Sequence, residues 1–377
     1  MDAQATGGFL RFFDELPDPR AANRIHRLCD IFAIAICAVI CGAQGWVDVQ
    51  MFAESKRTWL STFLDLQHGI PSHDTFGRVF ARIDPDAFER CFQNWMTSLR
   101  QGGMRLVAID GKSIRRSFEH AWDKSGMVHL VSAFAEQNRM VFGQVAAEGA
   151  NEIEAIPRLL ELLDVSESVV TIDALGCQRQ IAEQIVVSNK ADYVLAVKEN
   201  QPVLHEKVKQ LLDEAILEGF KGMEHDTIQT TDGDHGRIEY RQVWMTSEIQ
   251  HLPQSILDDW PALGSIAVVE SKRELNGKSS SQRRYFISSL DVPDARAMAG
   301  FIRGHWSVEN SLHWQLDVSF GEDDRRIRSN HGAENFSRLC RMALNLLKSD
   351  KTLKVGVKAK RLRAGWDEPY MLRLLTG

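Results

Sequence analysis

The sequence predicts an α/β protein in which a mixed sheet is covered by helices. Three observations support this prediction. Short apolar runs that alternate with helical patterns begin near residue 106. The second and third of these runs are joined by a short polar turn, as in a hairpin, whereas the later runs are separated by helices. An all-helical stretch comes before them, so the chain divides into a helical module and an α/β core.

The composition is that of an ordinary globular protein. The chain has 377 residues, of which 44% are hydrophobic and 25% charged, enough for two or three domains and a sizeable core. Its net charge of −6 argues against a uniformly basic coat for nucleic acid, though not against a local basic groove. The six cysteines form no CxxC pair, which fits a reducing cytoplasm better than a disulfide framework. The longest apolar run, Ile31–Cys41, is too short to span a membrane.

Residues 1–100 are expected to form the helical module. Apolar residues at helical spacing predict helices near residues 28–42 and 47–64. Helix-start residues predict two more helices, one from Ser72 to Arg82 and one from Pro85 onward. The helix from Ser72 to Arg82 is a candidate DNA recognition helix, but it carries few cations, so a packing role is the favoured interpretation.

The α/β core is expected over residues 101–350. Apolar runs predict five strands, in the order Leu106–Ile109, Met127–Glu136, Arg139–Ala147, Ser168–Ile172 and Tyr193–Val197. Helical spacing predicts the connecting helices Glu152–Leu163 and Gln178–Val187. A hairpin followed by alternating elements predicts a mixed sheet.

A strand-rich insertion is expected to interrupt the core at about residues 219–290. Its predicted strands are Asp226–Thr231, Ile238–Met245, Ser265–Ser271 and Arg284–Ser289. Helical patterns return at Asp294–Asp317, with a break near Gly304, and at Glu334–Lys348. Residues 351–377 are expected to form a basic C-terminal segment.

Two predicted strands end in an aspartate, Asp110 in LVAIDGKS and Asp173 in VVTIDALG. The carboxyl ends of such strands are where open α/β sheets place their sites. Two carboxylates on neighbouring strands repel each other, and a divalent cation such as Mg²⁺ or Mn²⁺ relieves that repulsion. The alternative is that each aspartate caps a turn, and Asp110-Gly111 is also a turn dipeptide.

A third carboxylate is expected from a helix beside these strands. Glu309 lies in RGHWSVENSLHWQLD, with His305 and His313 four residues before and after it on the same helical face. A polar helix face with tryptophans in the core is the alternative, and a zinc site made by the histidines is a weaker one. The run GEDDRRIR offers rival carboxylates but is expected to be a solvated, self-paired loop.

Three carboxylates around two divalent ions suit an in-line phosphoryl displacement, because the metals stabilise both the attacking and the leaving oxygen. Such a site can hydrolyse a DNA strand or transfer it, with water or a 3′-hydroxyl as the attacking group. The sequence contains no Walker-type glycine-rich loop, so it gives no support for nucleoside triphosphate hydrolysis.

Three long motifs in the same order make this sequence similar to the H-repeat-associated group of bacterial insertion-sequence transposases. They are AIDGKSIRRS, TIDALGCQRQIAEQIV with ADYVLAVKENQ, and RGHWSVENSLHWQLDVSFGEDDRRIR. The helical text before them, including CDIFAIAICAVICGAQGW and HGIPSHDTFGRVF, resembles that group too, so the resemblance covers about residues 10–370.

The resemblance implies a ribonuclease-H-like core and cut-and-paste transposition by a DDE triad of Asp110, Asp173 and Glu309. The triad would bind two Mg²⁺ ions, with Mn²⁺ as a substitute. The implied partner is double-stranded DNA, both terminal inverted repeats and target, held by a homodimer in the synaptic complex. The implied location is the bacterial cytoplasm, with nucleoid association when bound to DNA and no membrane contact.

One departure from the wider superfamily leaves an alternative open. Where that superfamily has Tyr, Arg and Lys around its glutamate, this sequence has Ile302, His305 and Leu316. The alternative is therefore a transposase-derived DNA-binding protein without strand-transfer activity. An intact set of three carboxylates argues against it.

Positive charge near the triad marks the expected DNA contacts. These residues are Lys112, Arg115, Arg116, Arg303, His305, His313, Arg325, Arg326 and Arg328. The run from Lys348 to Arg363 is a second basic candidate, with a solvated helix face as an equally weighted alternative.

Overall fold

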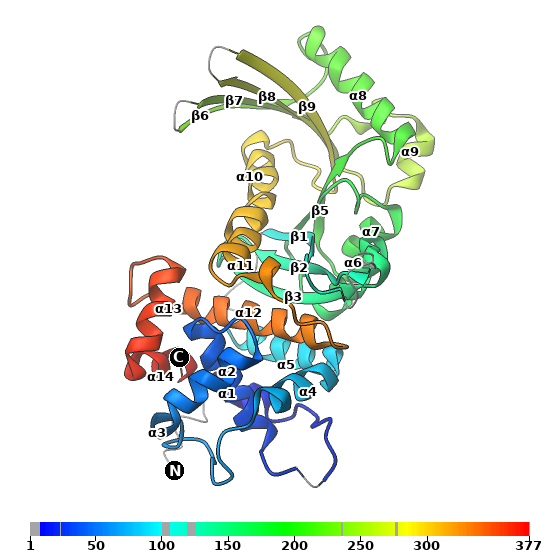
Figure 1. Ribbon diagram of the computed structural model, residues 1–377. Coiled ribbons are helices and arrows are strands. Elements are labelled where there is room, and N and C mark those ends of the chain that lie inside the picture. The colour runs from blue at the N-terminus through cyan, green and yellow to red at the C-terminus, as the bar shows by residue number, and fades with distance from the viewer. Residues whose placement is uncertain are drawn as a thin grey trace.

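The computed structural model describes residues 8–22, 24–99, 106–118, 126–234, 237–275 and 278–376. Within them, nine strands form one mixed sheet in the order β3-β2-β1-β4-β5-β9-β8-β7-β6. In Figure 1 this sheet runs from the middle of the molecule, where β1 to β3 lie, to the top, where β6 to β9 arch over α10. The domain boundary expected between residues 100 and 101 lies outside the described residues.

The first five strands form the core half of the sheet, where the resemblance led us to expect a ribonuclease-H-like fold. They are β1 (Leu106–Ser113), β2 (His129–Ala135), β3 (Met140–Ala147), β4 (Val169–Ile172) and β5 (Asp192–Val197). β2 pairs antiparallel with both β1 and β3, whereas β4 is parallel to both β1 and β5. The predicted mixed sheet is confirmed, and its order places the end of β4 beside Ile109 of β1. β1 continues to Ser113, beyond the predicted end at Ile109, because these residues pair with β2.

The predicted insertion supplies the other four strands. They are β6 (Asp226–Asp234), β7 (Arg237–Thr246), β8 (Ser265–Leu275) and β9 (Lys278–Ser288). β9 pairs antiparallel with β5, so the insertion continues the core sheet. β8 and β9 run farther than predicted, because the polar ends of an antiparallel ribbon need no apolar run to pair. Helix α8 (Pro202–Leu217) contacts both strands, and α9 (Gln254–Asp259) lies beyond it (Figure 1).

Helices cover both faces of β1. Successive residues of a strand point to opposite faces of a sheet. Gly111 faces the carboxylate of Glu152, the first residue of α6 (Glu152–Leu162). Asp110 faces the opposite side, where α10 (Ala295–His305) and the helical segment after it lie (Figure 1). The two faces of one strand therefore carry different chemistry.

Among the described residues, five α-helices precede the sheet where the sequence predicts four, because one predicted helix is divided in two. They are α1 (Leu28–Cys41), α2 (Trp46–Ser55), α3 (Arg57–Leu60), α4 (His73–Arg82) and α5 (Pro85–Ser98). The helix predicted near residues 47–64 is broken after Ser55, because Lys56 has φ −105° and ψ 14°. Phe76, Val79 and Phe80 bury one face of α4 against α2 and α12. This contact agrees with the packing role favoured for the helix from Ser72 to Arg82.

Helix α12 (Gly332–Ser349) lies between these helices and the sheet (Figure 1). A buried charge network holds it there. The Nε atom of Arg338 in α12 donates to Glu89 of α5 at 2.7 Å. The backbone N–H of Gln144 in β3 donates to the same carboxylate at 3.0 Å. Removing any one partner would leave a buried charge or donor unsatisfied.

The C-terminal segment packs into the helical module. It forms α13 (Val357–Trp366) and α14 (Glu368–Thr376). Arg361 donates to the carbonyl oxygens of Val39 at 2.8 Å and Ile40 at 3.1 Å, at the end of α1. Lys360 donates to the carbonyl oxygen of Leu347 at 2.8 Å. Part of the basic run predicted for DNA is thus used inside the fold, a role that sequence composition did not reveal.

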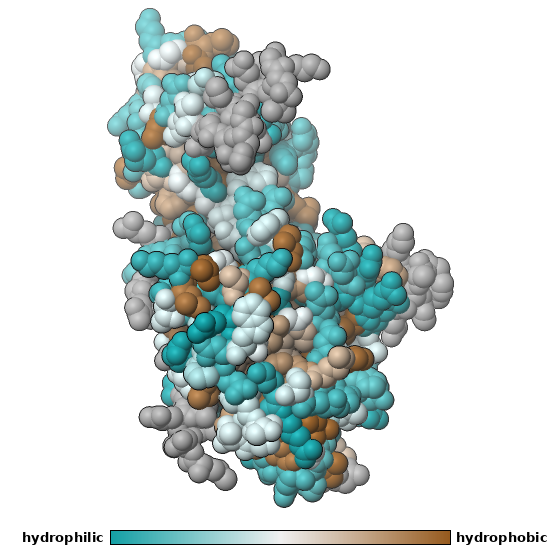
Figure 2. Space-filling view, turned by 60° about the vertical axis from the view of Figure 1, so that its left-hand side comes forward, coloured by the Kyte–Doolittle hydropathy of each residue, from teal (hydrophilic) through white to brown (hydrophobic). Residues whose placement is uncertain are grey.

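The lengths of the described helices and the hydropathy of the surface are the features that bear on a membrane-spanning segment. Among the described residues, no single helix is long and apolar enough to cross a membrane; α1 and α2 pass that test only as a pair bent by 96°. On the face shown in Figure 2, hydrophobic residues lie in small groups among hydrophilic ones.

Candidate active site

The first two predicted carboxylates lie at the same edge of the sheet. Ile109 of β1 pairs in parallel register with Ile172 of β4, and each is followed by its aspartate. Asp173 also caps a turn, because its Oδ1 accepts from the backbone N–H of Leu175 at 3.0 Å. The turn-capping alternative is thus confirmed for Asp173, and its role as a metal ligand stays a prediction.

Asp110 does not sit in a turn, so the turn-dipeptide interpretation of Asp110-Gly111 is wrong. Both residues lie inside β1 and pair with β2. The reason for the glycine is space. A Cβ atom at Gly111 would lie 2.2 Å from Oε1 of Glu152 and 2.5 Å from Nε2 of His129. These two side chains are joined by a 2.6 Å hydrogen bond on the face of β1 opposite Asp110.

Glu309 begins a five-residue π-helical turn, Glu309–His313. This turn lies between α10 and α11 (Trp314–Val318). The predicted helix is therefore continuous in sequence but irregular in the middle, with its break at Trp306 instead of Gly304. Single π-helical turns inside helices often occur at functional sites.

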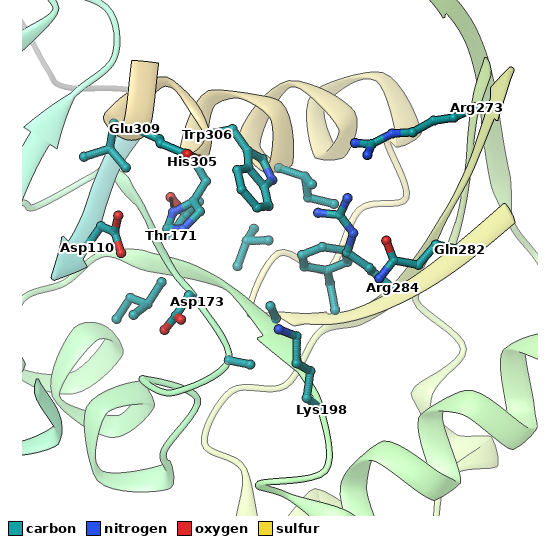
Figure 3. A pocket seen from close by; sticks show the side chains of 17 residues that line it. Asp110, Thr171, Asp173, Lys198, Arg273, Gln282, Arg284, His305, Trp306 and Glu309 are labelled. Carbon is teal, nitrogen blue, oxygen red and sulfur yellow. Dashed lines mark hydrogen bonds between the residues drawn. The ribbon is translucent and has the colours of Figure 1, made fainter. Parts of the chain in front are cut away.

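All three predicted carboxylates line one cavity of about 580 Å³. Figure 3 shows Asp110, Asp173 and Glu309 on one side of this cavity. Arg273, Gln282 and Arg284, which come from β8 and β9, lie on the other side, with Lys198 below them (Figure 3). The cavity thus has an acidic end formed by the core and a basic end formed largely by the insertion.

Sequence reasoning missed the basic end. Lys198 directly follows β5, just as Asp173 directly follows β4, so the strand-end rule could have found it. Arg273 and Arg284 gave no such signal, because only the pairing of β9 with β5 brings the insertion to the cavity. Arg284 lies 5.2 Å from the centre of the Trp306 ring, which orients its guanidinium group.

The acidic end carries uncompensated charge. Burial raises the pKa of Asp110 to about 7, and the charges of Asp173, Glu152 and Glu309 add to this shift. A divalent cation would relieve the repulsion, and carboxylate oxygens are the ligands that Mg²⁺ and Mn²⁺ prefer. The donor set therefore fits such a metal. Among the described residues, no three His, Cys, Asp or Glu side chains are already close enough to hold an ion, so binding requires these side chains to close around it.

The two histidines flank the carboxylates as neutral groups. Nδ1 of His313 lies 3.6 Å from Oδ2 of Asp110, and Nδ1 of His305 lies 3.1 Å from the hydroxyl of Thr171. Burial lowers the pKa of His313 to about 3, with Arg341 and Lys112 adding to the effect, and burial also lowers the pKa of His305. Neutral, buried imidazoles are better suited to orient neighbouring groups than to attract phosphates by charge.

The other expected DNA contacts are divided between surface and interior. Arg303 and Arg326 are exposed, and Arg303 lines a second cavity of about 430 Å³ that shares Trp306 and Arg284 with the first. Arg325 is buried, donates to the carbonyl oxygen of Phe320 at 3.1 Å and lies over the Phe336 ring. Burial makes Arg325 unsuitable as a DNA contact in this conformation.

Lys112, Arg115 and Arg116 contact acidic groups of the chain itself. Lys112 bonds Asp317 at 2.5 Å. Arg115 pairs with Asp323 at 3.1 Å and Arg116 with Asp324 at 3.5 Å. The run GEDDRRIR is therefore not mainly self-paired as expected.

Its first acid, Glu322, is fully buried and pairs with Arg341 of α12 at 2.9 Å. Burial acts to raise the pKa of Glu322, but Arg341 and Arg325 outweigh it and hold the pKa at about 2. Glu322 does not line the carboxylate cavity.

Comparison with known proteins identifies the family of this chain. The family model described as "Transposase DDE domain" matches residues 101–346, and the model described as "DDE_Tnp_1-associated" matches residues 10–96. The chain belongs to the DDE transposase family. The cavity with Asp110, Asp173 and Glu309 lies within the matched transposase domain, and the helical module corresponds to the associated one.

Curated relatives support the H-repeat-associated group that the motifs indicated. The chain is 40% identical over 373 residues to "Putative transposase YncI" of Escherichia coli O157:H7, covering 97% of this chain and 94% of the relative. It is 38% identical over 375 residues to "H repeat-associated putative transposase YhhI" of Escherichia coli K12, covering 96% of each. A piggyBac transposase synaptic complex with hairpin DNA is a distant structural neighbour, with 12% identity, a TM-score of 0.43, and coverage of 100% of this chain and 80% of the other.

The structure places the two apolar departures from the superfamily pattern differently. Leu316 is fully buried, so a polar side chain there would face the core of this DDE transposase. Ile302 is 8% exposed and lines the carboxylate cavity as an apolar wall. The cations that line the cavity come from β8, β9 and Lys198, the residue after β5.

Proposed function

We propose that this DDE transposase cleaves DNA and transfers strands at the ends of an insertion sequence, by cut-and-paste transposition. The observation that carries the proposal is the single cavity lined by Asp110, Asp173 and Glu309. They come from the interior of β1, the residue after the neighbouring strand β4, and an irregular helical turn. The raised pKa of Asp110 supports it, because uncompensated acids are typical of sites that await a cation.

Asp110, Asp173 and Glu309 would hold the metal, Mg²⁺ with Mn²⁺ as a substitute. Two ions bound there supply charge stabilisation for the attacking and leaving oxygens of an in-line displacement. His313 is placed to orient Asp110, and His305 to keep Thr171 and the adjacent end of β4 in position. These contacts keep the carboxylates available before any ion or DNA arrives.

The basic end of the cavity would receive the DNA backbone. Lys198, Arg273 and Arg284 line the same cavity as the carboxylates, so they would contact phosphates of a DNA backbone that enters it. Arginine and lysine neutralise phosphate charge and fix its orientation. We propose this role in addition to the DNA contacts predicted for residues around the glutamate.

The chemistry consists of two displacements at phosphorus. In the first, water attacks the phosphodiester at the element end, the bond to the 3′-oxygen breaks, and a 3′-hydroxyl is released. In the second, this 3′-hydroxyl attacks a target phosphodiester and a target 3′-oxygen leaves. In each step the attacking oxygen loses a proton and the leaving oxygen gains one.

The partners proposed are duplex DNA with terminal inverted repeats and a duplex target. Two ends must be held together before transfer, so we propose a homodimer in the DNA-bound complex. The protein would act in the bacterial cytoplasm, in contact with the nucleoid while bound to DNA.

The experiment is cleavage of end-labelled DNA that carries the flanking inverted repeats, with Mg²⁺ or Mn²⁺. Wild-type protein is compared with Asp110→Asn, Asp173→Asn and Glu309→Gln, and with Glu218→Gln as an exposed acid outside the cavity. We expect nicks at the repeat ends from the wild type and the control only. If the wild type binds the ends but cuts with neither metal, the alternative of a DNA-binding protein without transfer activity replaces this proposal. The observation that favours this alternative is that apolar Ile302 and Leu316 stand where the superfamily has polar residues.

A further inference from the structure

The basic segment that follows Asp110 meets an acidic loop of the same chain. We use "basic segment" for Lys112 to Arg116 and "acidic loop" for Glu322 to Asp324, between α11 and α12 (Figure 1). Their contacts run in order along both segments. Lys112 approaches Asp323 at 3.6 Å, Arg115 pairs with Asp323 at 3.1 Å, and Arg116 pairs with Asp324 at 3.5 Å.

The contacts change from fixed to exchangeable along the loop. At one end Glu322 is fully buried against Arg341, which anchors the loop to α12. At the other end the side chains are 79% and 23% exposed in the Arg115–Asp323 pair, and 49% and 77% exposed in the Arg116–Asp324 pair. A pair that is exposed on both sides, as Arg116–Asp324 is, contributes about 0–1 kcal/mol, so another anion can displace Asp324 at little cost. The exposed Arg115 side chain can turn from Asp323 to such an anion.

The backbone around these arginines is ordered independently of the acidic loop's carboxylates. Nε of Arg328 donates to the carbonyl oxygen of Arg116 at 3.3 Å, and its guanidinium lies 5.0 Å from the centre of the Phe118 ring. Arg115 and Arg116, just after the strand that carries Asp110, thus form one cationic surface with Arg328. A carboxylate and a phosphate offer arginine the same pair of oxygens, and a phosphate of the DNA backbone fits each position that an aspartate now occupies.

We propose that Asp323 and Asp324 act as an internal competitor for DNA phosphates at this surface. DNA that binds here must displace both carboxylates, so the chain lowers its own affinity for nonspecific duplex. Ends that are also held elsewhere on the protein still bind. This inference rests on the proposed DNA-binding function and adds its regulation.

The proposal predicts the salt dependence of binding. The slope of log affinity against log salt is about −0.9 for each phosphate that a protein cation neutralises. An arginine already paired with an aspartate contributes less to that slope. Freeing Arg115 and Arg116 should therefore steepen the slope by up to about 2.

The experiment measures binding of the full-length protein to a labelled duplex that lacks the inverted repeat, by anisotropy over a range of NaCl concentrations. The test variant is Asp323→Asn with Asp324→Asn. The matched control is Glu218→Gln with Asp291→Asn, two exposed acids that follow α8 and β9 and give the same change in net charge. We expect the test variant to bind about three- to tenfold more tightly with the steeper slope, and the control to shift affinity far less with an unchanged slope.

Three results would overturn the inference. If the test variant and the control gain the same DNA affinity, the effect comes from net charge and not from the acidic loop. If the test variant binds DNA more weakly than wild type, the loop only supports the basic segment. The third result is a gain in DNA affinity that remains when Arg115→Ala is added to the test variant. Circular dichroism confirms folding, and Asp324→Asn alone, at the most exposed position, repeats the test if the double variant fails to fold. Absence of DNA binding by every form, at low salt, would instead reject the proposed function itself.

Discussion

Two groups of carboxylates lie near β1, and their surroundings are opposite. Asp110 lies with Asp173 and Glu309 on one side of a cavity, and burial together with these like charges raises its pKa to about 7. Glu322 is more deeply buried, yet Arg341 and Arg325 overcome that burial and hold its pKa at about 2. The same chemical group is thus destabilised in one region and stabilised in the other. Burial alone does not mark a functional acid; burial without a counter-ion does.

The largest effect we expect on stability comes from removing the charge of Glu322, the carboxylate that is paired with Arg341. Glu322→Gln should lower the unfolding free energy by about 3 kcal/mol, because Arg341 would keep its charge without its partner. The measurement is urea denaturation followed by tryptophan fluorescence. The control Asp324→Asn, at an exposed acid, should stay within about 0.5 kcal/mol of wild type. If Glu322→Gln loses less than about 1 kcal/mol of unfolding free energy, the ion pair with Arg341 does not stabilise Glu322 as we infer.

Removing the charge of Asp110, the carboxylate without a counter-ion, should change the free energy of unfolding in the opposite direction. Asp110→Asn should raise the stability of metal-free protein at pH 8 by about 1–2 kcal/mol, because it removes a charge that the cavity disfavours. Thermal unfolding in EDTA measures this, with Asp291→Asn as the exposed control. A variant less stable than wild type would show that Asp110 is held by contacts stronger than its repulsions.

The two regions should also titrate in different pH windows. Asp110 has a folded pKa of about 7, above its ordinary 3.8, so the folded state holds an extra proton between these values and stability falls as pH rises through them. Glu322 has a folded pKa of about 2, below its ordinary 4.5, so its contribution is lost as pH falls from 4.5 to 2. Asp110→Asn should flatten the upper window and leave the lower one unchanged. Stability curves in EDTA with the same slope between pH 5 and 7 for both proteins would count against this assignment.

The smallest effect concerns the basic end of the cavity. Lys198→Ala or Arg284→Ala should weaken binding of the element end a few-fold and reduce the salt slope by about 0.9 each, since each removes one phosphate contact. Lys221→Ala, at an exposed lysine outside the cavity, should leave both quantities unchanged. An unchanged slope in the two cavity variants would place the DNA backbone elsewhere.

The sequence predicted the acidic end of this site and missed the basic end, for a physical reason. Asp110 and Asp173 follow apolar strands, and that local pattern fixes their place at the edge of a parallel pair. Arg273 and Arg284 reach the cavity only through the pairing of β9 with β5, a contact between distant segments that no local pattern encodes.

Cations were the least predictable residues. Composition treats Arg361, Arg325 and Arg115 alike. Arg361 caps the end of α1, Arg325 packs on an aromatic ring in the interior, and Arg115 pairs with an acid at the surface. The order of strands and the helical module were predictable because apolar periodicity determines them, whereas the partner of each charge depends on tertiary packing.

The most direct test of the central claim is a Mn²⁺ titration followed by electron paramagnetic resonance, which reports bound metal without DNA or turnover. We compare wild type, Asp110→Asn and, as the matched control in the acidic loop, Asp324→Asn. The account predicts that wild type and Asp324→Asn bind Mn²⁺ alike, and that Asp110→Asn binds at least about tenfold more weakly, because the cation loses a ligand between Asp173 and Glu309. Equal Mn²⁺ affinity in all three proteins would contradict the claim that the uncompensated carboxylates form the metal site.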